Sequence, residues 1–232
     1  KEAILKSINL LNGSSFEEIR TLIDGALKLG NDNDFGYEYF QDFETRYVPR
    51  YRKPVSTGWL RMDELTQGGL GKGELGVVVA PTGAGKSMAL VHLGAEAVSN
   101  GHSVIHYTLE LQDTVVAKRY DSCITEIPLS ELDSRKNEVL DIVKNIEGEL
   151  IVKEYPTKSA STRTLASHLE KIRMHGKKID MIIVDYGDLL RPVERRKEKR
   201  NELESIYEEL RGLAQEYQCP IWTASQTNRS GL

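Results

Sequence analysis

The chain has 232 residues, of which 39% are hydrophobic and 28% are charged, and its formal net charge at pH 7 is −4. A chain of this length can bury one α/β core with an appendage, and it contains no apolar run of the roughly 20 residues that a membrane-spanning helix needs. The acidic balance argues against a surface that is basic throughout, although a local basic groove is compatible with it. We therefore predict a soluble protein that does not contact a membrane.

The two cysteines give no sign of a disulfide framework or a zinc site. Cys123 and Cys219 are far apart in the sequence, and neither has the CxxC or histidine spacing that metal sites use. The sequence also shows no signal-peptide pattern and no internal repeat. These features favour a reduced, cytoplasmic setting.

Residues 1–53 are predicted to form a linker that precedes the core. A helix is expected after Ser14 or Ser15, because apolar residues then recur at helical spacing, two glutamates fall in the first turn, and Gly30 lies near the end. The apolar positions of this helix are Phe16, Ile19, Ile23, Ala26 and Leu27. Such a stripe can fold back on the chain's own core or dock on another subunit, and the sequence slightly favours docking.

The charge reverses after the polar and acidic residues 31–44. The stretch Arg46–Gly58 carries four basic residues and no acidic one, and prolines at positions 49 and 54 interrupt it. Proline, and the restriction that it places on the preceding residue, disfavour a helix. We therefore expect an extended basic arm here, and a core that begins at residue 54.

A glycine-rich loop stands between an apolar strand and an apolar helix. Val77, Val78 and Val79 form the β-branched run typical of a strand that is buried on both faces, and a helix is expected over Met88–Val98. In the loop, backbone N–H groups beside the glycines can bind phosphate oxygens, the lysine can bind the β- and γ-phosphates, and the serine hydroxyl can ligate Mg²⁺. The predicted nucleotide-binding residues are Pro81, Thr82, Gly83, Ala84, Gly85, Lys86, Ser87 and Met88.

An ordinary glycine turn is the alternative interpretation of this loop. Ala80 stands where phosphate-binding loops usually have glycine, but alanine is small enough to be accommodated. The order of strand, loop and helix argues against an ordinary turn. We therefore predict that the chain binds ATP or another nucleoside triphosphate together with Mg²⁺.

Strands alternate with helices through the rest of the chain. Further strands are expected at 103–110, 150–155, 181–186 and 221–225, and helices at 60–65, 113–123, 134–146, 162–174 and 201–217. This alternation predicts an α/β fold in which a mostly parallel sheet is covered by helices on both faces. In such folds, ligands bind at the carboxyl ends of the strands.

Three polar residues at expected strand ends are candidates for catalysis. Asp185 follows the apolar run M-I-I-V and suits a carboxylate that holds Mg²⁺ beside Ser87, although a helix cap or turn is the alternative. Glu110 could orient and deprotonate the attacking water, and Gln226 could sense the γ-phosphate or orient that water. For Glu110 and Gln226, a solvated strand end or a polar loop is the competing interpretation.

The segment Arg191–Arg200 directly follows the strand expected to end near Asp185, and it contains six basic and two acidic residues. Its candidates for contacts with DNA phosphates are Arg191, Arg195, Arg196, Lys197, Lys199 and Arg200. A solvated charged run is the alternative, and no aromatic residue lies within the segment to stack on bases.

Several stretches resemble, in the same order, the motifs of the RecA-like P-loop ATPase domain of DnaB-type replicative helicases. They are P-V-S-T-G-W-L-R-M-D-E-L-T-Q-G-G-L before the P-loop, T-L-E at 108–110, I-I-V-D-Y at 182–186 and S-Q-T-N-R at 225–229. Within that family, A-K-R-Y-D-S at 117–122, K-E-Y-P-T at 153–157 and I-W-T-A-S-Q at 221–226 are similar to the replicative helicases of T4-like phages. The resemblance covers residues 54–232.

The resemblance implies roles for the candidate residues. In the family, the positions that match Lys86 and Ser87 bind phosphate and Mg²⁺, Glu110 matches the catalytic base, Asp185 the Walker B acid, and Gln226 the residue that couples the γ-phosphate to the DNA-binding loops. Family members are ring hexamers that translocate on single-stranded DNA during replication. The resemblance therefore implies a homo-oligomeric ring, with single-stranded DNA, primase and a helicase loader as candidate partners, in the host cytoplasm if a phage encodes the chain.

Some parts of the family's pattern are not found in these residues. Family members have a primase-binding domain before the linker, and a second DNA-contacting loop and an arginine finger after the S-Q motif, so we expect the chain to be a fragment of a longer protein. Two other classes of this fold remain open. A strand-exchange recombinase would form open filaments, and a clock-like or signalling ATPase would be indifferent to DNA. The order of the motifs favours the helicase.

Overall fold

The computed structural model describes residues 36–48, 52–194 and 198–227. The chain divides into two compact units, Lys1–Tyr51 and Arg52–Leu232. The helix expected after Ser14 lies outside the described residues.

The described part of the first unit is a small aromatic cluster around one arginine. A single 3₁₀ turn, η2 (Glu44–Arg46), ends at Arg46. The guanidinium carbon of Arg46 lies 4.1 Å from the centre of the Tyr39 ring and 5.1 Å from that of Phe43, which is the geometry of cation–π contacts. The basic stretch predicted to be extended throughout therefore begins inside a helical turn, because these rings hold its first residue.

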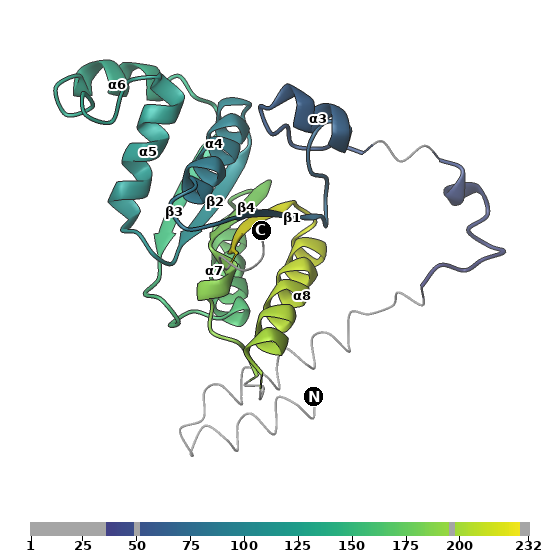
Figure 1. Cartoon of the computed structure of the whole chain (residues 1–232). Helices are drawn as coiled ribbons and strands as arrows, with labels where there is room; N and C mark the ends of the chain where they lie inside the picture. Colours follow the sequence, from purple (N-terminus) through teal and green to yellow (C-terminus); the bar gives the residue numbers. More distant parts are fainter. Residues whose placement is uncertain (1–35, 49–51, 195–197, 228–232) are drawn as a thin grey trace, which may run out of the picture. The chain divides into compact units, whose positions relative to one another are not determined.

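The second unit is built on one sheet of five parallel strands in the order β1-β5-β4-β2-β3 (Figure 1). The strands are β1 (Leu75–Ala80), β2 (Ser103–Thr108), β3 (Glu149–Glu154), β4 (Met181–Asp185) and β5 (Ile221–Gln226). The helices are α3 (Leu60–Thr66), α4 (Lys86–Ser99), α5 (Asp113–Thr125), α6 (Lys136–Val143), α7 (Thr162–Met174) and α8 (Lys199–Tyr217), and a 3₁₀ turn, η3 (Gly187–Leu189), follows β4.

Helices cover both faces of this sheet (Figure 1). On one face Leu90 of α4 packs in a cluster with Ile183, and on the other face Leu165 of α7 and Leu210 of α8 pack in a cluster with Ile182. Neighbouring residues of β4 join different clusters because successive side chains of a strand point to opposite faces. The predicted α/β fold is therefore confirmed. None of the described helices is both long enough and apolar enough to cross a membrane.

β1, which leads into the P-loop, and β4, which ends at Asp185, differ in burial. Every residue of β4 is buried, as a central strand between two covered faces requires. β1 is the last strand at one end of the sheet, and its Val77 and Val79 are 37% and 59% exposed. The prediction that the valine run is buried on both faces was wrong for these two residues, because neighbouring elements cover an edge strand only in part.

The predicted core elements overlap the observed ones, with one difference that concerns the site. β2 ends at Thr108, so Glu110 lies two residues beyond the strand rather than at its last position. The intervening Leu109 donates its N–H to the carbonyl oxygen of Asp185 over 2.9 Å, and its own carbonyl accepts from the Thr157 hydroxyl over 2.6 Å. These contacts hold the chain beside β4 as it leaves the sheet.

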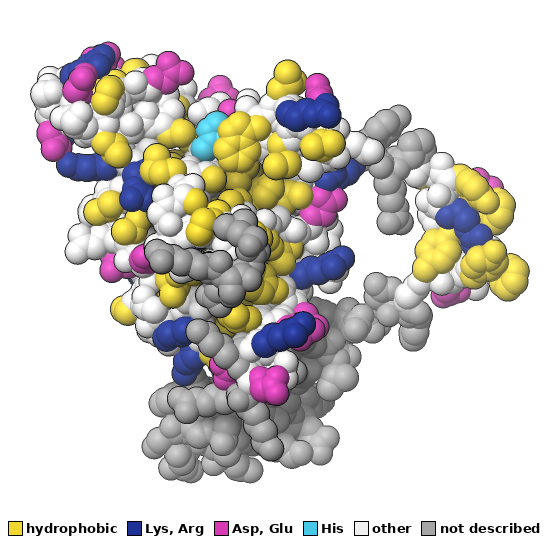
Figure 2. Space-filling model, viewed as in Figure 1, with side chains coloured by type: hydrophobic (Ala, Val, Ile, Leu, Met, Phe, Trp, Pro, Cys, Tyr) yellow, Lys and Arg dark blue, Asp and Glu magenta, His cyan; other side chains and the backbone are white. Residues whose placement is uncertain are grey.

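Apolar side chains also gather on the surface at α3, as Figure 2 shows. Leu60 and Leu65 are 79% and 69% exposed. Trp59, which precedes the helix, stacks on His92 of α4 with ring centres 4.5 Å apart. This stacking joins α3 to the helix that follows the P-loop.

Candidate nucleotide-binding site

The loop between β1 and α4 has the backbone shape that its glycines allow. Gly83 and Gly85 have φ angles of 78° and 91°, in the left-handed region that residues with a Cβ rarely adopt. A Cβ placed on either glycine would meet no atom within 4 Å, so the requirement for glycine comes from the backbone conformation and not from crowding. Gly85 is also the N-cap of α4, which aims the first N–H groups of this helix at the loop.

The first two residues of α4 make different contacts. Lys86 donates from Nζ to the carbonyl oxygens of Ala80 and Pro81, at 3.1 and 3.0 Å. Ser87 donates from Oγ to Oδ1 of Asp185 at 3.1 Å. The P-loop thus contributes a cation and a hydroxyl side by side, and the hydroxyl is already in contact with the acid at the end of β4.

Asp185 is the buried acid of the site. Its side chain comes from the centre of the sheet and the residue is only 1% exposed. Burial raises its pKa and so disfavours the charged form, the hydrogen bond from Ser87 opposes this rise, and the negative charge of Glu110 adds to it. A carboxylate in these surroundings gains more from a nearby cation than a solvated one does.

A cavity of about 330 Å³ opens above these residues. It is lined by Thr82, Gly83, Gly85, Lys86, Ser87, Met88, Glu110, Leu111, Arg119, Tyr186 and Gln226. Most of the predicted P-loop residues therefore face one space together with Glu110 and Gln226. Pro81 and Ala84 do not line it, and instead shape the loop through a 3.4 Å hydrogen bond from the Ala84 N–H to the Pro81 carbonyl.

The strand order explains why Gln226 reaches the P-loop. β5 lies between β1 and β4, and Gln226 is paired in register with Ala80. Its Nε2 donates to Oγ1 of Thr82 at 2.6 Å, and its Oε1 accepts from the Tyr186 hydroxyl at 3.3 Å. Gln226 therefore bridges the P-loop and the residue that follows Asp185.

Residues 54–231 match the family model described as the DnaB-like helicase C terminal domain. The chain belongs to this family. The resemblance inferred from its motifs is thereby confirmed.

One relative, the DnaB-like replicative helicase of Enterobacteria phage T4, is 30% identical over 218 residues, which are 88% of this chain and 46% of that protein. The replicative DNA helicase DnaB of Helicobacter pylori strain 26695 is 25% identical over 229 residues, which are 95% of this chain and 44% of that protein. This DnaB-like chain spans less than half the length of either relative.

Two solved structures share the fold of the DnaB-like chain. A DnaB-like replicative helicase, described together with its interactions with primase, superposes with a TM-score of 0.66 at 17% identity and covers 99% of this chain and 57% of that one. The second structure, an ATPase domain, superposes with a TM-score of 0.65 at 18% identity and covers 90% of this chain and 72% of that one. These likenesses extend the agreement in fold beyond the sequence motifs.

The sequence reasoning missed three residues that line the cavity of this DnaB-like chain, namely Leu111, Arg119 and Tyr186. Arg119 is the most informative, because α5 contributes a cation to the lining of the cavity. Its neighbours Val116 and Tyr120 are buried, so Arg119 lies at the border of the buried stripe of α5. The sequence did offer one indication of this role, because Arg119 is a basic residue next to the apolar positions of a helix that begins shortly after Glu110.

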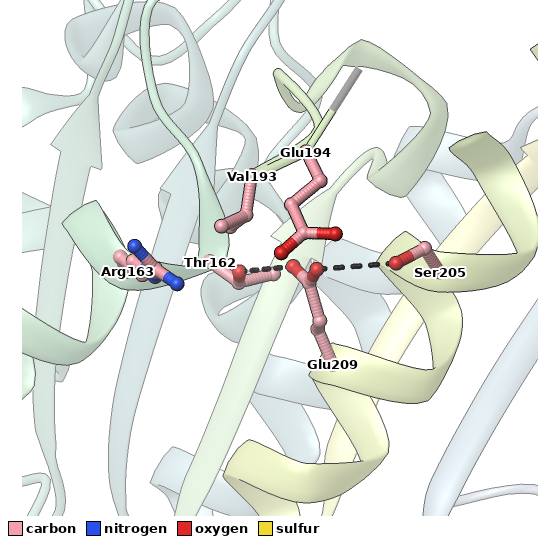
Figure 3. Close-up of a pocket in the computed structure, with 6 residues that line it drawn as sticks. All are labelled: Thr162, Arg163, Val193, Glu194, Ser205 and Glu209. Atoms are coloured by element: carbon pink, nitrogen blue, oxygen red, sulfur yellow. Dashed lines mark hydrogen bonds between the residues drawn. The ribbon is translucent and has the colours of Figure 1, made fainter. Parts of the chain in front are cut away.

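The basic segment of the DnaB-like chain is described only at its ends, since residues 195–197 and the side chain of Lys199 fall outside the described part. Arg191 and Arg200 are exposed. A cavity of about 310 Å³ lies at the start of the segment, and Glu194 and Glu209 are among the residues that line it (Figure 3). Glu209, on α8, accepts hydrogen bonds from Thr162 at the start of α7 and from Ser205 on α8, so its side chain joins α7 to α8.

Proposed function

We propose that this chain is the nucleotide-hydrolysing motor of a replicative DNA helicase. One observation carries the proposal: Lys86, Ser87, Glu110 and Gln226 line one cavity in a DnaB-like fold, and Asp185, which lies outside its lining, contacts Ser87 from the end of β4. The proposal goes beyond the family assignment, because the chain covers only part of its relatives. Neither a recombinase nor a clock-like ATPase is favoured by the family match.

In this proposal, each residue acts on a different part of the nucleotide. Lys86 exchanges its contacts with the loop carbonyls for the β- and γ-phosphates, where it neutralises charge. Glu110, exposed at the rim of the cavity, accepts the proton of the attacking water. Gln226 contacts the γ-phosphate through the amide that now bridges Thr82 and Tyr186, and Arg119 supplies a second positive charge from α5.

Mg²⁺ suits the oxygen donors of this site. The Ser87 hydroxyl and the Asp185 carboxylate are hard ligands 3.1 Å apart, and Mg²⁺ usually takes its remaining ligands from phosphates and water. Among the described residues, no group of three or more His, Cys, Asp or Glu side chains could hold a metal ion. A site completed by the nucleotide is therefore the form we propose, in which the ion neutralises charge on the phosphates.

The partners of the chain follow from the same proposal. We expect a hexameric ring in which residues 1–53 dock each subunit on its neighbour, with single-stranded DNA bound by the basic segment and with primase and a helicase loader as further partners. Burial of an apolar side chain such as Phe16 in a neighbour contributes about 1.5–3 kcal/mol. The protein with residues 1–54 removed should then fold but remain monomeric in light scattering, and an unchanged oligomeric state would refute the docking.

The decisive experiment is single-stranded DNA binding and DNA-stimulated ATPase activity in the full-length protein. Arg195, Arg196, Lys197 and Arg200 are replaced together by Ser, and binding is measured over a salt series with an ATP analogue present. Each phosphate interaction that the substitutions remove should lower the slope of log affinity against log salt by about 0.7, and DNA stimulation of the ATPase should disappear.

The control variant removes the same charge from exposed positions outside the basic segment. Its four Ser substitutions replace the exposed residues Lys136, Lys144, Arg173 and Lys177. General attraction between the protein and DNA would weaken alike in both variants, whereas a specific contact affects the first alone. Equal salt slopes in the two variants would show that the basic segment does not bind DNA. A parent protein whose ATPase activity is not stimulated by DNA would overturn the helicase function.

A further inference from the structure

One carboxylate outside the nucleotide cavity joins three elements of the fold. Asp188 lies in η3, the turn that follows β4. Its oxygens accept hydrogen bonds from the Tyr207 hydroxyl of α8 at 2.5 Å, the Ser225 hydroxyl of β5 at 3.1 Å and the Gln226 backbone N–H at 3.1 Å. The end of β5 is therefore fixed to η3 and α8 by a single side chain.

These contacts fix the backbone of the residue that bridges the cavity. Gln226 is held by Asp188 at its N–H, while its side chain donates to Thr82 over 2.6 Å and accepts from Tyr186. Hydrogen bonds weaken steeply as distance and angle depart from the optimum. A shift of the Gln226 backbone by about 1 Å would thus break the contact between its amide and the P-loop.

Tyr207 makes this arrangement depend on α8. Its hydroxyl lies 2.5 Å from Asp188 and 3.2 Å from the carbonyl oxygen of Ala224, so its one hydrogen is directed mainly at the carboxylate. Burial and the hydrogen bond to Asp188 both raise the pKa of Tyr207, so the hydroxyl remains a donor at neutral pH. A displacement of α8 would pull on Asp188 directly.

We propose that Asp188 is a positioning residue that sets Gln226 against the P-loop and, through Tyr207, makes this setting depend on α8. Asp188 does not line the cavity, so it acts through the backbone of Gln226. The inference rests on the proposed function, in which Gln226 contacts the γ-phosphate. Because α8 begins at Lys199, inside the basic segment, DNA bound there reaches the nucleotide site by this route.

The first test compares Asp188→Ala with Asp188→Asn in the full-length protein, by steady-state ATPase kinetics without DNA. Asp188→Ala should lower kcat by about tenfold or more while KM for ATP stays within twofold, because misplacement of a group that acts during the reaction affects turnover more than substrate binding. Asp188→Asn keeps an oxygen that can accept from the Gln226 N–H, and should recover most of the missing turnover.

The second test separates coupling to α8 from stability. Tyr207→Phe removes only the hydroxyl, and should reduce the ratio of turnover with and without single-stranded DNA. Tyr217→Phe is the matched control, because Tyr217 lies on the same helix and its hydroxyl donates to the Ala166 carbonyl at 3.0 Å, in the α7 contact. It should lose thermal stability to a similar extent and keep the parent's DNA stimulation.

The outcomes distinguish this inference from the proposed function. A kcat for Asp188→Ala within twofold of the parent, or an equal reduction of stimulation in Tyr207→Phe and Tyr217→Phe, would reduce Asp188 to a structural residue and leave the helicase function intact. A parent protein that hydrolyses ATP without DNA stimulation would overturn the helicase function, and the kcat comparison of the Asp188 variants would still decide the positioning role. A parent protein that hydrolyses no nucleotide would overturn both.

Discussion

The nucleotide site holds its two central charges in opposite ways. Lys86 is partly exposed at the start of α4, and the carbonyl oxygens of Ala80 and Pro81, where the P-loop begins, accept its hydrogen bonds. Asp185 is buried at the end of the central strand, where burial raises its pKa. The charge of Lys86 is therefore stabilised by nearby carbonyl groups. The charge of Asp185 carries a desolvation penalty, which a bound cation offsets. The loop side can therefore rearrange around phosphate, and the strand side is preorganised for a positive ion.

The largest expected effect concerns Glu110, which lies at the exposed rim between these two sides. Glu110→Gln keeps the size of the side chain and removes its basicity, so turnover should fall by about 10²–10⁴-fold while affinity for an ATP analogue stays close to that of the parent. Single-turnover hydrolysis and equilibrium binding measure the two separately. Normal turnover in this variant would assign the base to another residue.

The loop side is tested next by Lys86→Ala. Removal of a charge-assisted interaction with the phosphates should weaken triphosphate binding by at least about a hundredfold. The melting temperature of the protein alone should change little, because Lys86 is partly exposed and its ammonium group contributes few packing contacts. Fluorescent nucleotide titration and thermal melting test both statements, and a large drop in stability would show that the loop depends on its lysine.

Asp185→Asn, at the end of β4, should raise the stability of the protein and lower its activity. Replacing a buried carboxylate by its neutral amide removes a desolvation penalty, so the melting temperature should rise by a few degrees, which is the shift that about 1 kcal/mol produces in a domain of this length. Turnover should fall at the same time, to an extent no greater than in Glu110→Gln. Asp141→Asn, at an exposed position of α6, is the control and should change neither. A lower melting temperature for Asp185→Asn would contradict the contrast between the two sides.

The smallest expected effect is a change of stability with pH, and it arises from a buried side chain that is neutral in the folded protein. His106 on β2 is fully buried, its Nδ1 lies 2.9 Å from the Tyr120 hydroxyl, and burial lowers its pKa to about 3. The unfolded chain binds a proton near pH 6.5 and the folded chain does not, so stability is lost as pH falls from about 6.5 toward 3.

The free energy of unfolding should therefore fall by on the order of 2 kcal/mol between about pH 7 and about pH 5 because of His106 alone. Denaturant unfolding of the parent and of His106→Asn, whose amide oxygen takes the place of Nδ1 and can still accept from Tyr120, measures this difference. Parallel pH profiles in the two proteins would mean that His106 titrates alike in the folded and unfolded states.

The parts of the site that are encoded locally could be predicted from the sequence. The P-loop depends on glycines at fixed spacing and on the helix that follows, and Asp185 ends an apolar run that only a buried strand requires. Arg119 could not be predicted in the same way, because its position depends on how α5 packs beside β3 and α4. The exposure of Val79 was mispredicted for a related reason, since the sequence does not reveal that β1 lies at the end of the sheet. Asp188 was missed because its three donors come from segments distant in sequence.

The position of β1 has a consequence for association. Within the described residues β1 pairs with β5 alone, so the backbone N–H and C=O groups on its other side can accept an additional strand. A strand added there would pair with β1, whose last residue, Ala80, is where the P-loop begins. Growth of the sheet at this edge would therefore act directly on the phosphate-binding loop.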